Sequence, residues 1–153
     1  MTTDLILEIV PLAEVPQDEV LEFPDRPVVL VVDDEQVIAD TLSMILSQNG
    51  YSVLTAYEGK TALKLAMTTP PDLLLTDVMM PGMTGIELAI MLVHSVPTCR
   101  VLLFSGQAAT SDLLGKASEL GYSFDLLTKP VHPTDLLQRI KTSIEKEKSA
   151  VVV

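Results

Sequence analysis

The chain has 153 residues, of which 48% are hydrophobic and 20% charged, and this balance indicates one well-packed globular domain. The single cysteine, Cys99, excludes an intramolecular disulfide and suits a reducing compartment. A net charge of −11 argues against nucleic-acid binding, which needs clustered Lys and Arg, and no apolar run reaches the roughly 20 residues that cross a bilayer. We therefore expect a cytoplasmic protein that binds neither nucleic acid nor membrane.

The amino-terminal segment differs in composition from the rest of the chain. Residues 1–25 contain seven acids and no Lys or Arg, so they carry −7 of the net charge and leave −4 for the remainder. Residues 5–10 have a strand-like pattern, but four prolines between positions 11 and 27 interrupt the segment after it. We expect residues 1–26 to form an acidic, partly ordered arm. An added edge strand and a docking segment for another chain are the alternatives that remain open.

From Pro27 onward, strand and helix patterns alternate. Short apolar runs predict buried parallel strands over residues 28–32, 52–56, 73–76, 100–104 and 124–127. Helical patterns follow them around Ile38–Leu46, over 58–68, after the capping pair Thr84 and Glu87, over 108–120, and over 133–148. This alternation predicts an α/β fold, a doubly wound five-stranded parallel sheet with five helices. We expect one domain over residues 27–148, a short tail over 149–153, and no second domain.

Polar side chains stand where four of these strands end. Asp33 and Asp34 follow the first strand, Asp77 the third, Ser105 the fourth and Lys129 the fifth. The carboxyl ends of parallel strands lie at one edge of a sheet, so these groups should converge. Two carboxylates about 5 Å apart repel by about 3 kcal/mol at an effective dielectric of 20, which a lysine and a divalent cation would offset. Carboxylate ligands favour Mg²⁺, and the set suits phosphoryl transfer to an aspartate.

The polar residues at the strand ends give the chain a resemblance to a known family. The arrangement is similar to that of the receiver domains of bacterial response regulators, including the single-domain chemotaxis regulators. The motifs that carry this resemblance are Val32-Asp33-Asp34-Glu35, Asp77-x-x-Met80-Pro81-x-Met83-x-Gly85, Ser105-Gly106 and Lys129-Pro130. The resemblance covers about residues 27–148 and implies a flavodoxin-like sheet of strand order 2-1-3-4-5.

The resemblance also implies a metal-binding set. Asp77 would be the phosphoacceptor and a Mg²⁺ ligand, Asp34 would bind the ion directly, and Asp33 would bind it mainly through water. The backbone carbonyl of Met79 would supply a further ligand.

The remaining site residues are assigned by the same resemblance. Ser105 would donate a hydrogen bond to a phosphoryl oxygen, Lys129 would pair with another, and the Lys129-Pro130 bond would be cis. The family usually has Tyr or Phe three residues before this lysine, as the rotameric partner of the Ser or Thr, whereas this chain has Leu126. We expect the phosphorylation chemistry to survive and the conformational switch to be weaker or built differently.

These features predict a stand-alone receiver that is not a conventional enzyme. It would accept a phosphoryl group from a histidine kinase or phosphotransfer protein and act on an unknown downstream protein, with a homodimer possible. A degenerate receiver that binds partners without phosphorylation is the alternative. A phosphohydrolase of the haloacid dehalogenase type would need a second Asp at position 79, where Met79 stands. A dinucleotide-binding domain would need a glycine-rich turn after the first strand instead of Asp33-Asp34-Glu35.

Overall fold

The computed structural model describes residues 26–106 and 110–152. The strands are β1 (Val28–Val32), β2 (Ser52–Ala56), β3 (Leu73–Asp77), β4 (Arg100–Ser105) and β5 (Asp125–Thr128). The helices are α2 (Gln36–Ser47), α3 (Gly59–Thr68), α4 (Gly85–Ser95), α5 (Thr110–Glu119) and α6 (Pro133–Val152). The expected amino-terminal arm, apart from residue 26, lies outside the described residues.

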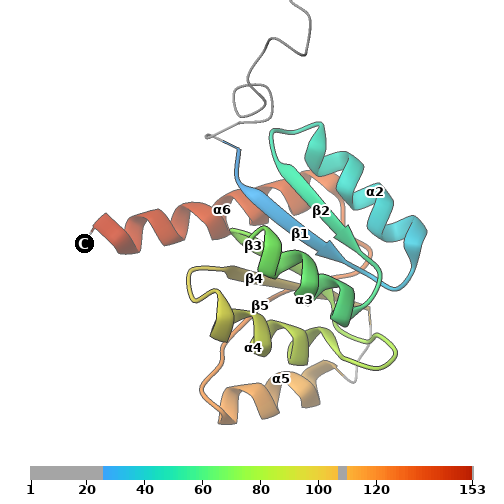
Figure 1. The fold of residues 1–153 in the computed structure, drawn as a ribbon, viewed down its shortest axis with the longest axis vertical. Coiled ribbons are helices and arrows are strands. Elements are labelled where there is room, and N and C mark those ends of the chain that lie inside the picture. The colour runs from blue at the N-terminus through green and yellow to red at the C-terminus, as the bar shows by residue number, and fades with distance from the viewer. Residues whose placement is uncertain (1–25, 107–109, 153) are drawn as a thin grey trace, which may run out of the picture.

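The five strands form one parallel sheet in the order β2-β1-β3-β4-β5 (Figure 1). This is the doubly wound, flavodoxin-like order, so the predicted fold class is confirmed. The chain reverses its direction of winding between β1 and β3, which are hydrogen-bonded neighbours. In such sheets the crevice beyond the carboxyl ends of the strands at this reversal is where ligands bind.

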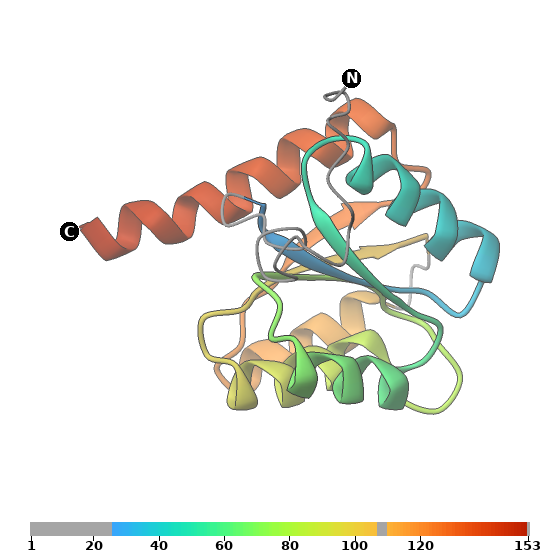
Figure 2. The same cartoon turned by 45° about the horizontal axis from the view of Figure 1, so that its top comes forward.

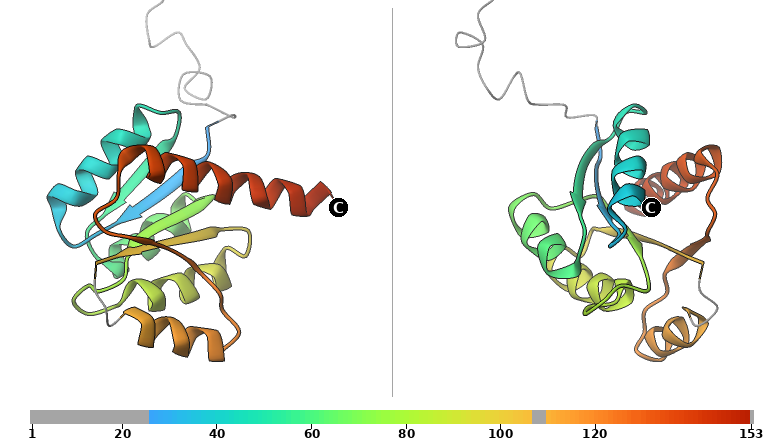
Figure 3. Two further views of the ribbon diagram at one scale, coloured as in Figure 1. Left: turned by 180° about the vertical axis from the view of Figure 1, so that it is seen from behind. Right: turned by 90° about the vertical axis from the view of Figure 1, so that its right-hand side faces the viewer.

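Helices cover both faces of the sheet, with α2 and α6 on one side and α3, α4 and α5 on the other (Figures 2 and 3). Alternate residues of the central strands serve the two layers. In β1, Val29 and Val31 pack with α2 and α6, whereas Leu30 and Val32 pack with α3 and α4. Both faces are therefore buried, which explains why the central strands are apolar at nearly every position.

Several element ends differ from those that the sequence pattern predicts. β3 includes Asp77, β4 includes Ser105, and β5 covers 125–128, because pairing with neighbouring strands continues past the apolar runs. The tail predicted over 149–153 is instead helical as far as Val152, since no Gly or Pro interrupts it. Neither α6 nor any other helix in the described part of the chain has the length and hydropathy to cross a bilayer.

The start of α4 is fixed tightly against the end of β3. The predicted capping box is present: the Glu87 amide donates to Thr84 Oγ1 at 3.1 Å, and the Thr84 amide donates to Glu87 Oε1 at 2.9 Å. A Cβ on Gly85 would lie 1.9 Å from the carbonyl oxygen of Asp77. Only glycine therefore lets α4 begin so close to the last residue of β3.

Candidate functional site

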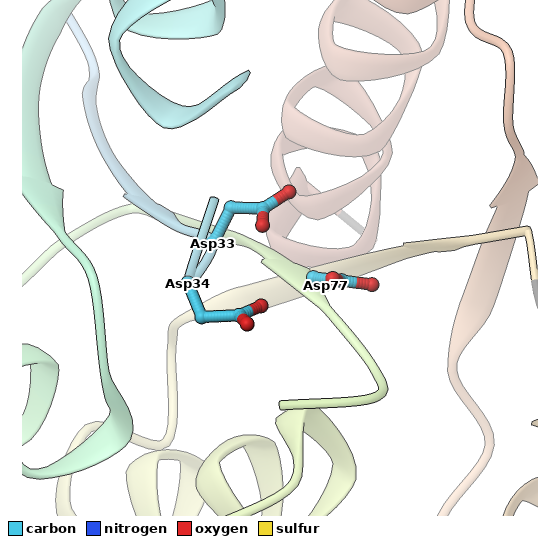
Figure 4. A group of neighbouring side chains, drawn as sticks. All are labelled: Asp33, Asp34 and Asp77. Carbon is cyan, nitrogen blue, oxygen red and sulfur yellow. The ribbon is translucent and has the colours of Figure 1, made fainter. Parts of the chain in front are cut away.

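Three aspartates come together at the carboxyl edge of the sheet (Figure 4). Asp33 and Asp34 follow β1, and Asp77 is the last residue of the adjacent strand β3. One carboxylate oxygen from each lies within 4.8 Å of the other two. Asp33 is fully buried, Asp77 is 7% exposed, and Asp34 is exposed. The arrangement thus has two buried carboxylates and one that faces solvent.

Lys129 supplies the positive charge of this group from the end of the edge strand β5. Its Nζ lies 3.3 Å from Asp33 Oδ2 and 3.4 Å from Asp77 Oδ2, so it pairs with both buried carboxylates. The same ammonium stands 4.8 Å from the centre of the Phe104 ring. β5 brings Lys129 here because it pairs with β4, and the Lys129 amide donates to the Ser105 carbonyl at 3.0 Å. The Lys129-Pro130 bond is cis, as the resemblance implied.

Backbone amides hold the other oxygen of each buried carboxylate. The Glu35 amide donates to Asp33 Oδ1 at 2.9 Å, and the Val78 amide donates to Asp77 Oδ1 at 2.8 Å. With Oδ2 of each residue directed to Lys129, both carboxylates have a fixed orientation. Such bonds to the ionised form reduce the cost of burying charge.

Burial nevertheless dominates the electrostatics of the pair. Removal from water raises the pKa of Asp33 above its ordinary value, although the Glu35 amide and Lys129 lower it in part. Burial also raises the pKa of Asp77, and the neighbouring charge of Asp33 raises it further. Lys129 alone therefore does not offset the negative charge. A site of this kind favours an additional cation with a preference for oxygen ligands.

A cavity of about 360 Å³ opens beside the carboxylates. It is lined by Asp34, Glu35, Asp77, Met79, Gly106 and Lys129. Of the residues singled out in the sequence, Asp34, Asp77, Met79 and Lys129 thus face one space, and Asp33 joins them through its ion pair with Lys129. Ser105 is buried at the end of β4, directly before the lining residue Gly106.

Three further residues belong to this region, and none of them was assigned a role from the sequence: Glu35 and Gly106 stand there only as parts of motifs, and Phe104 only within a predicted strand. Glu35 lines the cavity and its amide holds Asp33, a role that its place directly after the aspartate pair could have suggested. Gly106 also lines the cavity. The ring of Phe104 lies against the Lys129 ammonium, and no local pattern distinguishes it from the other apolar residues of β4.

Leu126 occupies an apolar position on β5. It is partly buried and packs against a cluster on the α4 and α5 side of the sheet, made of Val78, Ile86, Leu103 and Ala117. The nearby aromatic residues have other contacts: Tyr122 stacks on Phe124 and is hydrogen-bonded through its hydroxyl to His94. Through His94, which lies in the last turn of α4, these rings contact the end of that helix, and they do not occupy the position of Leu126. His94 is exposed and makes an edge-to-face contact with the Tyr122 ring as well as the hydrogen bond with its hydroxyl.

Comparison with known proteins identifies the family. The sequence model of the response regulator receiver domain matches residues 29–141. The alkaline phosphatase synthesis transcriptional regulatory protein PhoP of Bacillus subtilis (strain 168) is 37% identical over 123 residues, which are 80% of this chain and 50% of that protein. The chain therefore spans about half the length of this curated relative.

Solved structures agree with this assignment. The CheY-like response regulator receiver domain protein of Methanospirillum hungatei JF-1 has a TM-score of 0.75 and 27% identity, over 82% of this chain and 99% of that one. A response regulator receiver domain protein of Clostridium thermocellum has a TM-score of 0.72 and 28% identity, over 81% and 98% of the two chains. With its strand order and its three converging aspartates, the chain belongs to the response regulator receiver domain family.

Proposed function

We propose that this chain is a magnesium-dependent phosphoacceptor of the cytoplasm, which receives a phosphoryl group on Asp77 from a histidine kinase or a phosphotransfer protein. One observation carries the proposal: the Asp77 carboxylate lines an open cavity and has two further aspartates and the Lys129 ammonium beside it. Asp77 is thus accessible to a reactant, while the Val78 amide and the Lys129 ammonium hold its carboxylate in one orientation.

The transfer is a displacement at phosphorus. A carboxylate oxygen of Asp77 attacks the phosphorus atom in line, the bond from phosphorus to the donor's histidine nitrogen breaks, and its electron pair stays on that nitrogen. The product is an acyl phosphate that carries about two negative charges where Asp77 carried one. Lys129, now 3.4 Å from Asp77 Oδ2, pairs with a phosphoryl oxygen, and the Ser105 hydroxyl donates a hydrogen bond to another.

The proposed metal set combines the donors present with the ligand roles that the family resemblance implies. Asp34 and Asp77 would bind Mg²⁺ directly, Asp33 mainly through water, and the Met79 carbonyl would complete the protein ligands. Three carboxylates with one lysine fit a dication, since the charges then sum to zero. When bound, the ion supplies positive charge that stabilises the oxygens of the phosphoryl group in transfer.

We expect the phosphorylated chain to act through contacts with a downstream protein or a second copy of itself. The acidic composition and the lack of a basic stripe in the sequence disfavour direct DNA contact. PhoP, by its name, is a transcriptional regulatory protein, but this chain matches only half of its length.

Intact mass measured after incubation with acetyl phosphate and Mg²⁺ tests the proposal. We expect one phosphoryl adduct in the wild type and none in Asp77→Asn or without Mg²⁺. An adduct that persists in Asp77→Asn would assign the acceptor elsewhere. Absence of an adduct in the wild type, with Mg²⁺ binding retained, would refute the phosphoacceptor role.

The alternative is a receiver that binds partners without phosphorylation. Leu126 favours it, because an aliphatic side chain packed among Val78, Ile86 and Leu103 lacks the ring through which the switch usually reports phosphorylation. A phosphorylated wild type whose partner affinity equals that of Asp77→Asn would support this alternative.

A further inference from the structure

The peptide unit between Asp77 and Val78 connects two hydrogen bonds of the site. Its carbonyl oxygen, that of Asp77, accepts a hydrogen bond from Thr76 Oγ1 at 2.9 Å. Its N–H, that of Val78, donates to Asp77 Oδ1 at 2.8 Å. A peptide unit is planar and moves as one body, so a group that holds its oxygen also holds its N–H. The Thr76 hydroxyl is therefore linked to the Asp77 carboxylate through a single rigid unit.

The surroundings leave this peptide little room. Thr76 is fully buried, and a Cβ placed on Gly85 would lie 3.1 Å from Thr76 Oγ1 and 1.9 Å from the Asp77 carbonyl oxygen. The Gly85 amide donates to the Val78 carbonyl at 2.8 Å, and this bond holds the two ends of the loop between β3 and α4 together. The hydroxyl thus lies in the packed interior where α4 meets the end of β3, and Thr76 is fully shielded from solvent.

We propose that Thr76 is a positioning residue for the phosphoacceptor. Its hydroxyl fixes the plane of the 77–78 peptide, the N–H of that peptide fixes Asp77 Oδ1, and the carboxylate is thereby directed toward the cavity and Lys129. Thr76 does not line the cavity, so it acts only through this peptide. The inference rests on the proposed function of Asp77 and adds a residue that sets how fast Asp77 reacts.

Three variants test it, with the chain otherwise intact. Thr76→Val keeps the shape and removes the donor, Thr76→Ser keeps the donor, and Thr55→Val is the matched control. Thr55 lies on β2 and its hydroxyl is 2.7 Å from Ser43 Oγ, so this control loses a comparable hydrogen bond in another part of the sheet. The measurements are the rate of phosphorylation by acetyl phosphate in saturating Mg²⁺, the Mg²⁺ dissociation constant, and amide hydrogen exchange at Val78.

Thr76→Val should react about 10-fold more slowly and bind Mg²⁺ several-fold more weakly. Loss of a hydrogen-bond donor to a buried acceptor changes a rate constant or an equilibrium constant by roughly 10-fold. Its Val78 amide should exchange about 10-fold faster relative to that of Leu74, which lies within the same strand as Thr76. Thr76→Ser should stay within about twofold of the wild type in all three measurements, as should Thr55→Val in rate and Mg²⁺ binding.

A Thr76→Val protein with the wild-type rate and wild-type exchange at Val78 would overturn the inference, as would equal slowing by Thr55→Val. If valine prevents folding, Thr76→Ala takes its place with the same expectations. The two proposals fail separately. A wild type that takes no phosphoryl group refutes the phosphoacceptor role, while Mg²⁺ binding and exchange at Val78 still decide whether Thr76 holds the peptide.

Discussion

Substitution of Gly85 by alanine should damage both the stability and the reactivity of this receiver. The added Cβ would stand 1.9 Å from the Asp77 carbonyl oxygen, whereas real contacts of this kind essentially never fall below 3.0 Å. The start of α4 and the end of β3 must therefore separate by about 1 Å. Both partners are backbone, held by the Thr84 capping box and by pairing of β3 with its neighbours. No flexible side chain can absorb the overlap.

The magnitude follows from that displacement. Overpacking a dense interior costs about 1–3 kcal/mol when side chains can adjust, so a clash between backbones should cost about 3 kcal/mol or more. A shift of about 1 Å in a reacting group can slow a reaction by about 100-fold. Because Asp77 is the residue displaced, Gly85→Ala should lower the rate of phosphorylation by about that factor in the fraction that remains folded.

Gly115→Ala is the matched control. Gly115 lies within α5, and a Cβ there would meet nothing within 4 Å, so alanine should stabilise the protein by about 1 kcal/mol through helix propensity. Urea unfolding gives the stabilities, and intact mass after acetyl phosphate treatment gives the rates. A Gly85→Ala protein within about 1 kcal/mol of the wild type that is phosphorylated at the normal rate would refute the reasoning.

Other substitutions test the electrostatics of the site. Burial raises the folded-state pKa of Asp77 above its ordinary value of 3.8. Ionised Asp77 therefore lowers the free energy of unfolding once the pH exceeds about 3.8. Asp77→Asn without metal should therefore raise the urea midpoint at pH 7, and the gain should vanish below about pH 3.8; a lowered midpoint at pH 7 would contradict this. Lys129→Met should bind Mg²⁺ more tightly by calorimetry, since a competing cation is lost, yet be phosphorylated at least about 10-fold more slowly. Met79 lines the cavity as an apolar side chain that gives hydrolytic water little help, so Met79→Asn should shorten the lifetime of the phosphorylated form several-fold; an unchanged lifetime would count against this role.

Local patterns in the sequence predicted much of this protein because its elements are marked by local chemistry. The apolar runs that become β1 and β3 need only burial on both faces, and the Thr84–Glu87 pair that caps α4 needs only four consecutive residues. Asp77 was prominent because a carboxylate at the end of an apolar run is unusual. Element ends were less accurate, since the last residues of β3, β4 and β5 are set by pairing with other strands.

The sequence alone was enough to predict the elements, their alternation and the candidate residues for binding a cation or a phosphoryl group. The tertiary structure sets their geometry, because contacts between distant strands depend on packing across the whole sheet. It decided that one ammonium, on Lys129, lies 3.3 Å and 3.4 Å from two carboxylates. It also placed the Thr76 hydroxyl and Gly85 against the Asp77 carbonyl, where α4 returns to the end of β3. The Thr76 hydrogen bond lies within β3, but the contacts of Lys129 and Gly85 join residues from separate elements, and no local pattern encodes where those elements meet.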